Sequence, residues 1–403
     1  MTRPTDLIYV VLETLNSIGA DTFATDGDRS KALLAAYALV SRLETPWERI
    51  ARMCMNEASS SGDLSSAPAL WASLKVVKDL QLFEKWHEQG DAVQSSDELA
   101  ALVHCNPDLF GRILRHLAVN HVLAEPTAGM FKPTSFSLAL LQTVFGEWIN
   151  YLYDFGIPVF RSAPEYLQKT NYRNPTDPKD GIFQYAKNYQ GDLFEYFTSH
   201  PREGASFNHA MGGVMAHQAS WLDIIPGEHF IDGSNPDLPL VVDVGGNIGH
   251  DIEKFRQVYP ETAHRLYLQD RAAVVELAKC PDPVNKMVHN FFQPQPITKS
   301  RVYYLHGILH DWSDEPAQKI LLMLRDALMP GYSKLLVHDH VVPEKDAHPH
   351  ATSYDLTMMA MVAGLERTET QWRTLLSSGG YRVVKVWRSP LAAQAVIEAE
   401  VAL

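Results

Sequence analysis

Hydrophobic residues in the first part of the chain recur at three- and four-residue spacing, as on one face of a helix. The pattern predicts helices over residues 5–55 and a further helix over 74–86. Between them, residues 56–68 are rich in Ser and Gly, which predicts a loop.

The next stretch, up to residue 140, predicts two capped helices and a hairpin. Ser95 or Ser96 caps one helix, and Asn106-Pro107 begins the other. The apolar face of the second helix is expected to consist of Leu109, Ile113, Leu114 and Leu117. A turn at 127–129 then predicts a hairpin, which completes a winged-helix arrangement. Such a module binds DNA or serves packing and dimerisation, and the absence of a basic surface favours the second role.

The second half of the chain changes its pattern. Residues 141–235 are predicted to be mainly helical, with many aromatic residues that belong either to a core or to an apolar pocket. From residue 240, short apolar runs alternate with helical patterns. Strands are expected at 240–244, 265–269, 301–305, 334–339 and 381–386, and helices at 251–259, 272–279, 315–328 and 371–378. This alternation predicts an α/β domain with a mostly parallel sheet covered on both faces. The predicted domains are therefore 1–140, 141–235 and 236–403.

Composition narrows the class of protein. Of 403 residues, 46% are hydrophobic and 21% are charged, as in an ordinary globular protein. The net charge of −13 argues against a nucleic-acid partner. Cys54, Cys105 and Cys280 form neither a disulfide framework nor a zinc spacing, so no metal is expected. No secretory signal or membrane span is predicted, and we expect a cytoplasmic protein.

The first strand of the α/β domain ends in a glycine-rich turn. Asp243 is followed by Gly245, Gly246 and Gly249, and Asp270 ends the next strand, 27 positions after Asp243. Glycines at such a turn let a ligand approach the backbone, and an acid at the second strand end accepts the ribose hydroxyls of a nucleoside. The turn lacks the Gly-x-Gly-x-x-Gly spacing of a dinucleotide site. Asp243 would repel a pyrophosphate and attract a cationic amino-acid tail, which favours S-adenosylmethionine (SAM).

Several motifs in order resemble the class I SAM-dependent O-methyltransferases of the caffeic acid and hydroxyindole type, especially fungal secondary-metabolite members. They are Val-Asp-Val-Gly-Gly at 242–246, Leu-Gln-Asp-Arg at 268–271, Phe291-Phe292, Ile-Leu-His-Asp-Trp at 308–312 and Leu-Glu-Arg-Thr-Glu at 365–369. The resemblance implies a Rossmann-like catalytic domain and an N-terminal winged-helix dimerisation domain, hence a homodimer.

The resemblance also implies roles for individual residues. His310 would be the general base, with Glu366 and the shorter Asp339 at the positions of acids that orient it. The cofactor would contact Asp243, Gly245, Gly246, Gly249, Asp270, Arg271, Asn290, Phe291 and His306. Asn247, Asn290, His306 and Asp339 depart from the family's usual residues. For the acceptor pocket we expect apolar side chains from Phe183, Met211, Met215, Trp312, Met358 and Met359.

Two functions follow from these residues, and a third is disfavoured. The first is O-methylation of a phenol or enol on an aromatic or polyketide-type metabolite, because a histidine can take the proton of a phenol whose pKa is about 10. The second is a pericyclase of the same fold, which binds SAM and catalyses dehydration or cyclisation without consuming it. A DNA-binding regulator is disfavoured by the acidic charge balance.

Overall fold

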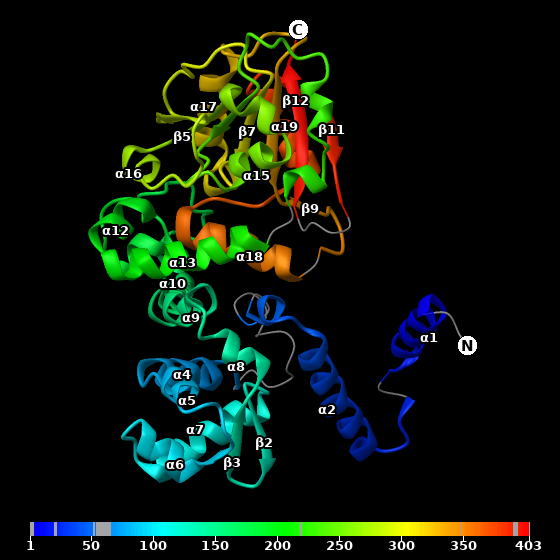
Figure 1. Ribbon diagram of the computed structural model, residues 1–403, viewed down its shortest axis with the longest axis vertical. Coiled ribbons are helices and arrows are strands. Elements are labelled where there is room, and N and C mark those ends of the chain that lie inside the picture. Colours follow the sequence, from blue (N-terminus) through cyan, green and yellow to red (C-terminus); the bar gives the residue numbers. More distant parts are fainter. Residues whose placement is uncertain are drawn as a thin grey trace. The chain divides into compact units, whose positions relative to one another are not determined.

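A computed structural model describes residues 4–19, 22–50, 53, 66–217, 220–347, 349–389 and 394–402. The chain divides into two compact units, one formed by Met1–Ala51 with Val76–Leu141 and the other by Arg52–Lys75 with Gln142–Leu403 (Figure 1). The predicted further boundary at residue 235 stays a prediction. Most of the loop predicted at 56–68 lies outside the described residues.

The N-terminal unit is mainly helical, as predicted. Helices α1 (Pro4–Ser17) and α2 (Asp26–Leu43) precede α5 (Leu82–Glu88), α6 (Ser96–Leu102), α7 (Pro107–Val119) and α8 (Ser135–Ala139). Strands β2 (Leu123–Thr127) and β3 (Met130–Pro133) form the predicted hairpin, and β1 (Gln94–Ser95) pairs with β3. Ser95 is the N-cap of α6, where its hydroxyl accepts from Glu98 N and its backbone N–H donates to the Glu98 carboxylate.

Two details of this unit correct the prediction. The helix expected over 74–86 is two helices, α4 (Ser66–Asp79) and α5, because Gln81 adopts a left-handed backbone conformation with φ 55°. The buried face of α7 consists of Phe110, Leu114 and Leu117, whereas Leu109 is 50% exposed. Asn106 is the N-cap of this helix. A buried face that begins at residue 110 continues at residues 114 and 117, with i, i+4, i+7 spacing, so residue 109 lies outside it.

The larger unit contains a seven-stranded sheet in the order β11-β12-β8-β7-β4-β5-β6. Its strands are β4 (Val241–Val244), β5 (Leu266–Asp270), β6 (Asn285–Val288), β7 (Val302–His306), β8 (Lys334–Asp339), β11 (Tyr381–Trp387) and β12 (Ala395–Val401). All pairs are parallel except those of β12, which runs antiparallel to both neighbours. The predicted mostly parallel α/β sheet is therefore confirmed.

Helices cover both faces of this sheet because its strands are buried on both sides. One face packs Val242 and Val244 against α17 (Asp314–Arg325) and α19 (Glu369–Ser378). The other packs Val241 against α15 (His250–Val258) and the turn around Trp221. The helix predicted over 272–279 is the short α16 (Ala272–Val275).

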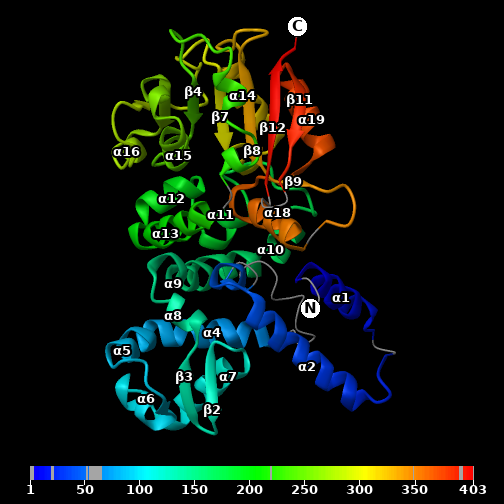
Figure 2. The ribbon, with the colours of Figure 1, turned by 45° about the vertical axis from the view of Figure 1, so that its right-hand side comes forward.

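Helices of the middle segment lie at the end of the unit where α18 (Pro349–Val362) is found (Figure 2). They are α9 (Thr143–Asn150), the π-helix η2 (Tyr151–Gly156), α10 (Ile157–Lys169), α11 (Ile182–Lys187), α12 (Leu193–Ser199) and α13 (Pro201–His217). Helix α14 (Glu228–Ile231) lies instead beside the sheet, where Phe230 packs with Val241 and Tyr304. α18 contacts both α10 and α11. Among the described residues, no helix has the length and apolar character needed to cross a bilayer.

Candidate active site

The glycine turn after β4 brings backbone and side chains into close contact. Gly245 has φ 73°, and a Cβ at this position would lie 2.7 Å from Ile308 Cδ1 and 3.6 Å from Phe291 Cε1. A Cβ on Gly246 would lie 2.4 Å from Asp243 Oδ2. Only glycine fits at these two positions, so the turn forms a narrow cradle between β4, Phe291 and the loop that contains His310.

Asp243 is the most enclosed acid of this turn. It is 1% exposed, and its Oδ2 has no hydrogen-bond partner among the described residues. Burial, together with the charges of Asp251 and Asp270, raises the pKa of Asp243 well above its usual range. A buried carboxyl oxygen without a partner is a costly arrangement that a cationic ligand group would relieve. This observation fits the ammonium-bearing tail of SAM.

Asp270 stands at the end of β5 and faces the same turn. Its Oδ2 accepts from Asn247 N at 2.9 Å, and its Oδ1 accepts from Arg271 N at 2.7 Å. Each carboxylate oxygen has a second lone pair for a ribose hydroxyl. Asn247 has φ 54°, and its own Oδ1 accepts from Ile248 N at 2.8 Å. Because Asn tolerates the left-handed region, this departure from glycine preserves the turn.

Asn290 and Phe291, which the resemblance places at the adenine of the cofactor, lie beside the turn. Asn290 Oδ1 accepts from Phe292 N at 3.0 Å, so this oxygen already has one protein partner. Phe291 stands next to Gly245, and Trp312 makes edge contacts with Phe291 and Phe292 at centroid distances of 6.2 Å and 4.9 Å. Trp312 therefore contacts the predicted adenine side.

His306 does not offer a free nitrogen to a ligand. Its Nδ1 lies 2.6 Å from Asp251 Oδ2, its Nε2 lies 3.0 Å from Gln394 Oε1, and its ring stacks on His338 at 4.0 Å. Burial lowers the pKa of His306, but Asp251 more than compensates and the net shift is upward. The contact with Asp251 joins the end of β7 to α15, the helix that follows the glycine turn.

The predicted catalytic residues meet at the end of β7. His310 lies in the 3-10 turn η5 (Leu309–Asp311), and its Nδ1 is 2.7 Å from Glu366 Oε1 and 3.8 Å from Asp339 Oδ1. Because a carboxylate only accepts, Nδ1 carries the proton and Nε2 is the nitrogen left to exchange one. Asp311, which the sequence analysis assigned no role, lies 3.5 Å from His310 Nε2. Its position next to His310 in the motif was the available signal.

Three acids therefore surround one histidine, and they change its titration. Burial alone lowers the pKa of His310, but the charges of Glu366, Asp311 and Asp339 outweigh burial and raise it well above its usual value. Burial raises the pKa of Asp339 to about 7 and that of Asp311 to about 6. Burial also opposes the ionisation of Glu366, but the contact with His310 holds its pKa below the usual value. Glu366 is thus the ionised partner of His310.

The described residues predicted for the acceptor pocket differ in their burial. Phe183 is fully buried among Phe155 and Tyr196, with centroid distances of 5.4 Å and 5.2 Å, so in this structure it is part of the core. Met211, Met358 and Met359 are partly exposed. The side chain of Met215 lies outside the described residues. A cavity of about 450 Å³ beside Trp312 is lined by Phe292, Gln293, Trp312, Glu315, Pro316 and Lys319, and none of these methionines borders it.

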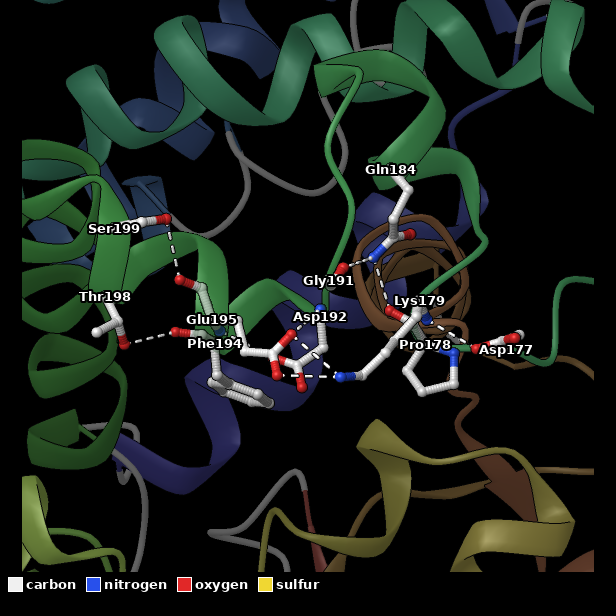
Figure 3. Close-up of polar contacts among 10 residues, drawn as sticks. All are labelled: Asp177, Pro178, Lys179, Gln184, Gly191, Asp192, Phe194, Glu195, Thr198 and Ser199. Carbon is white, nitrogen blue, oxygen red and sulfur yellow. Dashed lines mark hydrogen bonds and ion pairs between the residues drawn. The ribbon is translucent and has the colours of Figure 1, made fainter.

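A segment from α11 to α12 reaches the cofactor side. Gln184 is buried and donates to Pro178 O at 2.6 Å and Gly191 O at 2.9 Å, while Lys179 pairs with Glu195 at 3.0 Å (Figure 3). The ring of Phe194, in the same segment, lies 5.4 Å from the guanidinium carbon of Arg271. Phe194 is therefore a neighbour of the predicted cofactor residues that the spacing of motifs did not reveal.

In the part of the chain that the structure describes, no three His, Cys, Asp or Glu residues are grouped to hold an ion.

Comparison with known proteins gives the family. Residues 172–382 match the model of the O-methyltransferase domain, and residues 63–143 match that of the O-methyltransferase dimerisation domain. "O-methyltransferase mfmE" of Annulohypoxylon moriforme is 59% identical over 97% of this chain and 95% of its own length. "O-methyltransferase asqD" of Emericella nidulans is 37% identical over 80% and 84%.

Solved structures agree with these matches. The LepI complex with SAM has a TM-score of 0.76, 25% identity and coverage of 98% of both chains. OxaC with sinefungin and meleagrin has a TM-score of 0.74 and 25% identity over 83% of this chain and 86% of its own. With the glycine turn, Asp243 and Asp270 in place, these matches identify the chain as a member of the SAM-dependent O-methyltransferase family.

Proposed function

We propose that this enzyme transfers the methyl group of SAM to a phenol or enol hydroxyl of an aromatic or polyketide-type metabolite, with His310 as the general base. The observation that supports this role best is the buried 2.7 Å contact between His310 Nδ1 and Glu366 Oε1. It fixes the tautomer of the ring and leaves Nε2 to accept the proton of the acceptor hydroxyl.

The cofactor would be held by the residues around the glycine turn. Asp243 would bind its cationic amino-acid end, Asp270 its ribose, and Phe291 with Asn290 its adenine. Bound SAM supplies an electrophilic methyl group on a sulfonium. The chain contributes orientation, through the close fit at Gly245 and Gly246, and a base, His310, that accepts the proton of the acceptor hydroxyl and is surrounded by three acids.

The relatives support this choice of substrate class. Both curated relatives described above are named O-methyltransferases, and one solved relative is OxaC in complex with sinefungin and meleagrin. Met211, Met358 and Met359, partly exposed on α13 and α18, provide flexible apolar side chains for a bulky acceptor. We further propose a homodimer, supported by the dimerisation-domain match at residues 63–143. No nucleic-acid or membrane partner is proposed.

A second function is favoured by the charge around His310. Three nearby acids stabilise its imidazolium, which could act as an acid in a dehydration that precedes a cyclisation. A solved structure of similar fold, described as "A Pericyclic Reaction enzyme", has a TM-score of 0.76 and 26% identity and supports the same direction.

One experiment separates the two functions. Purified protein is incubated with methyl-labelled SAM and a panel of naphthols, hydroxyquinolines and enolic diketones, and both labelled product and S-adenosylhomocysteine are quantified. Methyl transfer yields both in equal amounts. Conversion of an acceptor without S-adenosylhomocysteine would establish the second function. Absence of SAM uptake by calorimetry would overturn both.

A further inference from the structure

Arg367 follows Glu366 directly, and its guanidinium is enclosed in the protein. The residue is 0% exposed and donates to Leu309 O at 2.9 Å and to Trp312 O at 2.8 Å. Its Nε and Nη2 also donate to Asp314 Oδ1, at 3.0 Å and 2.8 Å. All three acceptors belong to residues 309–314, the loop that contains His310.

The backbone before Glu366 contacts the same loop. Leu365 N donates to His310 O at 2.9 Å, and a Cβ on Gly364 would lie 2.1 Å from that oxygen. Glu366 N in turn donates to Asp355 Oδ1 at 2.9 Å, which anchors the segment to α18. Backbone and side-chain donors of 365 and 367 therefore hold the carbonyls at 309, 310 and 312.

η5 is a single short turn, in which Leu309 O accepts from Trp312 N at 3.3 Å. The carbonyls at 310 and 312 accept from Leu365 N and the Arg367 guanidinium, which lie outside the turn. Arginine suits this task, since its planar fork can donate in several fixed directions, whereas a lysine ammonium cannot reproduce that geometry. Asp314 is 75% exposed at its side chain and neutralises the buried charge from the solvent side.

We propose that Arg367 is a positioning residue, which holds the loop 309–314 against the segment that bears Glu366 and thereby sets the contact between His310 and Glu366. The inference rests on the proposed function, in which His310 exchanges a proton with the substrate. Arg367 acts through the loop backbone. The nitrogens of its guanidinium donate to Asp314 and to two carbonyls, and the guanidinium carbon lies 5.1 Å from the ring centroid of Trp372.

The test uses the full chain with two variants and two matched controls. Arg367→Lys keeps the charge and loses the fork, and Asp314→Ala removes the exposed partner without touching the core. Arg373→Lys changes an exposed ion pair of α19, and Asp326→Ala removes an exposed acid at the other end of α17. Each protein is measured for SAM affinity by calorimetry, for the His310 pKa by NMR of its Cε1–H, and for turnover with an acceptor from the panel above.

We expect kcat to fall about 100-fold for Arg367→Lys, as for a displaced catalytic group, and about 10-fold for Asp314→Ala. SAM affinity should stay unchanged, and the pKa of His310 should move down towards its ordinary value. The controls should match the wild type. A fall in thermal stability with an unchanged His310 titration would overturn the inference, as would wild-type turnover.

The two proposals fail in different ways. If the wild type takes up no SAM, the proposed function is wrong, whatever the His310 titration of the variants shows. If every protein takes up SAM and His310 has the same pKa in Asp314→Ala as in the wild type, only the role of Arg367 is wrong. Asp314→Ala decides the matter if Arg367→Lys does not fold.

Discussion

The cofactor side and the acceptor side of this enzyme are built in different ways. At the glycine turn, backbone geometry defines the site, so Gly245, Gly246 and Asp270 are each required by a contact that a short motif encodes. In the helical segment for which an acceptor pocket is predicted, aromatic rings such as Phe155 and Phe183 pack on one another. A site made by backbone can be found from sequence, whereas a site made by packed side chains depends on which rings leave space between them.

The largest effect is expected where the two sides meet, at His310. His310→Ala should lower kcat by about 10²–10⁴-fold and leave SAM affinity unchanged, because in the proposed function the residue moves a proton and does not bind the cofactor. Turnover of methyl-labelled SAM and calorimetry measure the two quantities. The exposed His264→Ala serves as a control. An equal loss of SAM affinity would place His310 on the cofactor side.

The next effect isolates the cofactor side. Asp270→Ala should raise the Kd for SAM by about 10–100-fold, since it removes charged acceptors for the ribose hydroxyls and releases the backbone at Asn247. Calorimetry at constant ionic strength provides the measurement, with the exposed Asp237→Ala as control. An unchanged Kd would mean that the turn does not grip a ribose.

The dependence of kcat/KM on pH tests how the acids around His310 affect its function. The pKa of His310 is raised, so a general base becomes competent only as the pH rises through that raised value, and kcat/KM should increase there. Asp339→Asn removes one of the charges that raise it, and should shift the rising limb to lower pH by about one unit. A profile that instead falls over the same range would assign His310 the role of an acid, as in the second function.

The smallest effect concerns the acceptor side. Phe183→Leu should lower the free energy of unfolding by about 1 kcal/mol and leave the KM of the acceptor unchanged, because the ring is fully buried in the aromatic core. Met358→Leu, in contrast, should change KM more than stability. Denaturant titration and steady-state kinetics compare the two. If Phe183→Leu changes KM and not stability, Phe183 is a pocket residue, as the sequence predicted.

Much of the catalytic fold could be predicted because strong patterns repeat along the chain. The β4 turn and most parallel strands follow runs of apolar residues that end in polar ones. Strand β12 was missed because the buried Glu398 interrupts its apolar run, and the structure satisfies that acid with Trp387 Nε1 at 2.9 Å. Strand β6 was missed because it is short and partly exposed, so its four residues do not form an apolar run.

For the candidate site, the sequence suggested some of the contacts that the structure contains. The His310–Glu366 contact joins positions 56 apart, which only the ordered motifs could suggest. The second bond of His306 to Gln394 and the burial of Phe183 depend on tertiary packing, which no local spacing encodes.

The C-terminal end of α18 limits how this enzyme could be redesigned. Gly364 N donates to Met358 O at 3.2 Å, so the helix that presents Met358 and Met359 runs directly into the segment that contacts the His310 loop. Mutagenesis aimed at new acceptors would therefore disturb the proton-transfer geometry when it varies α18. Libraries centred on Met211, on a separate helix, should broaden acceptor range at a lower cost in turnover.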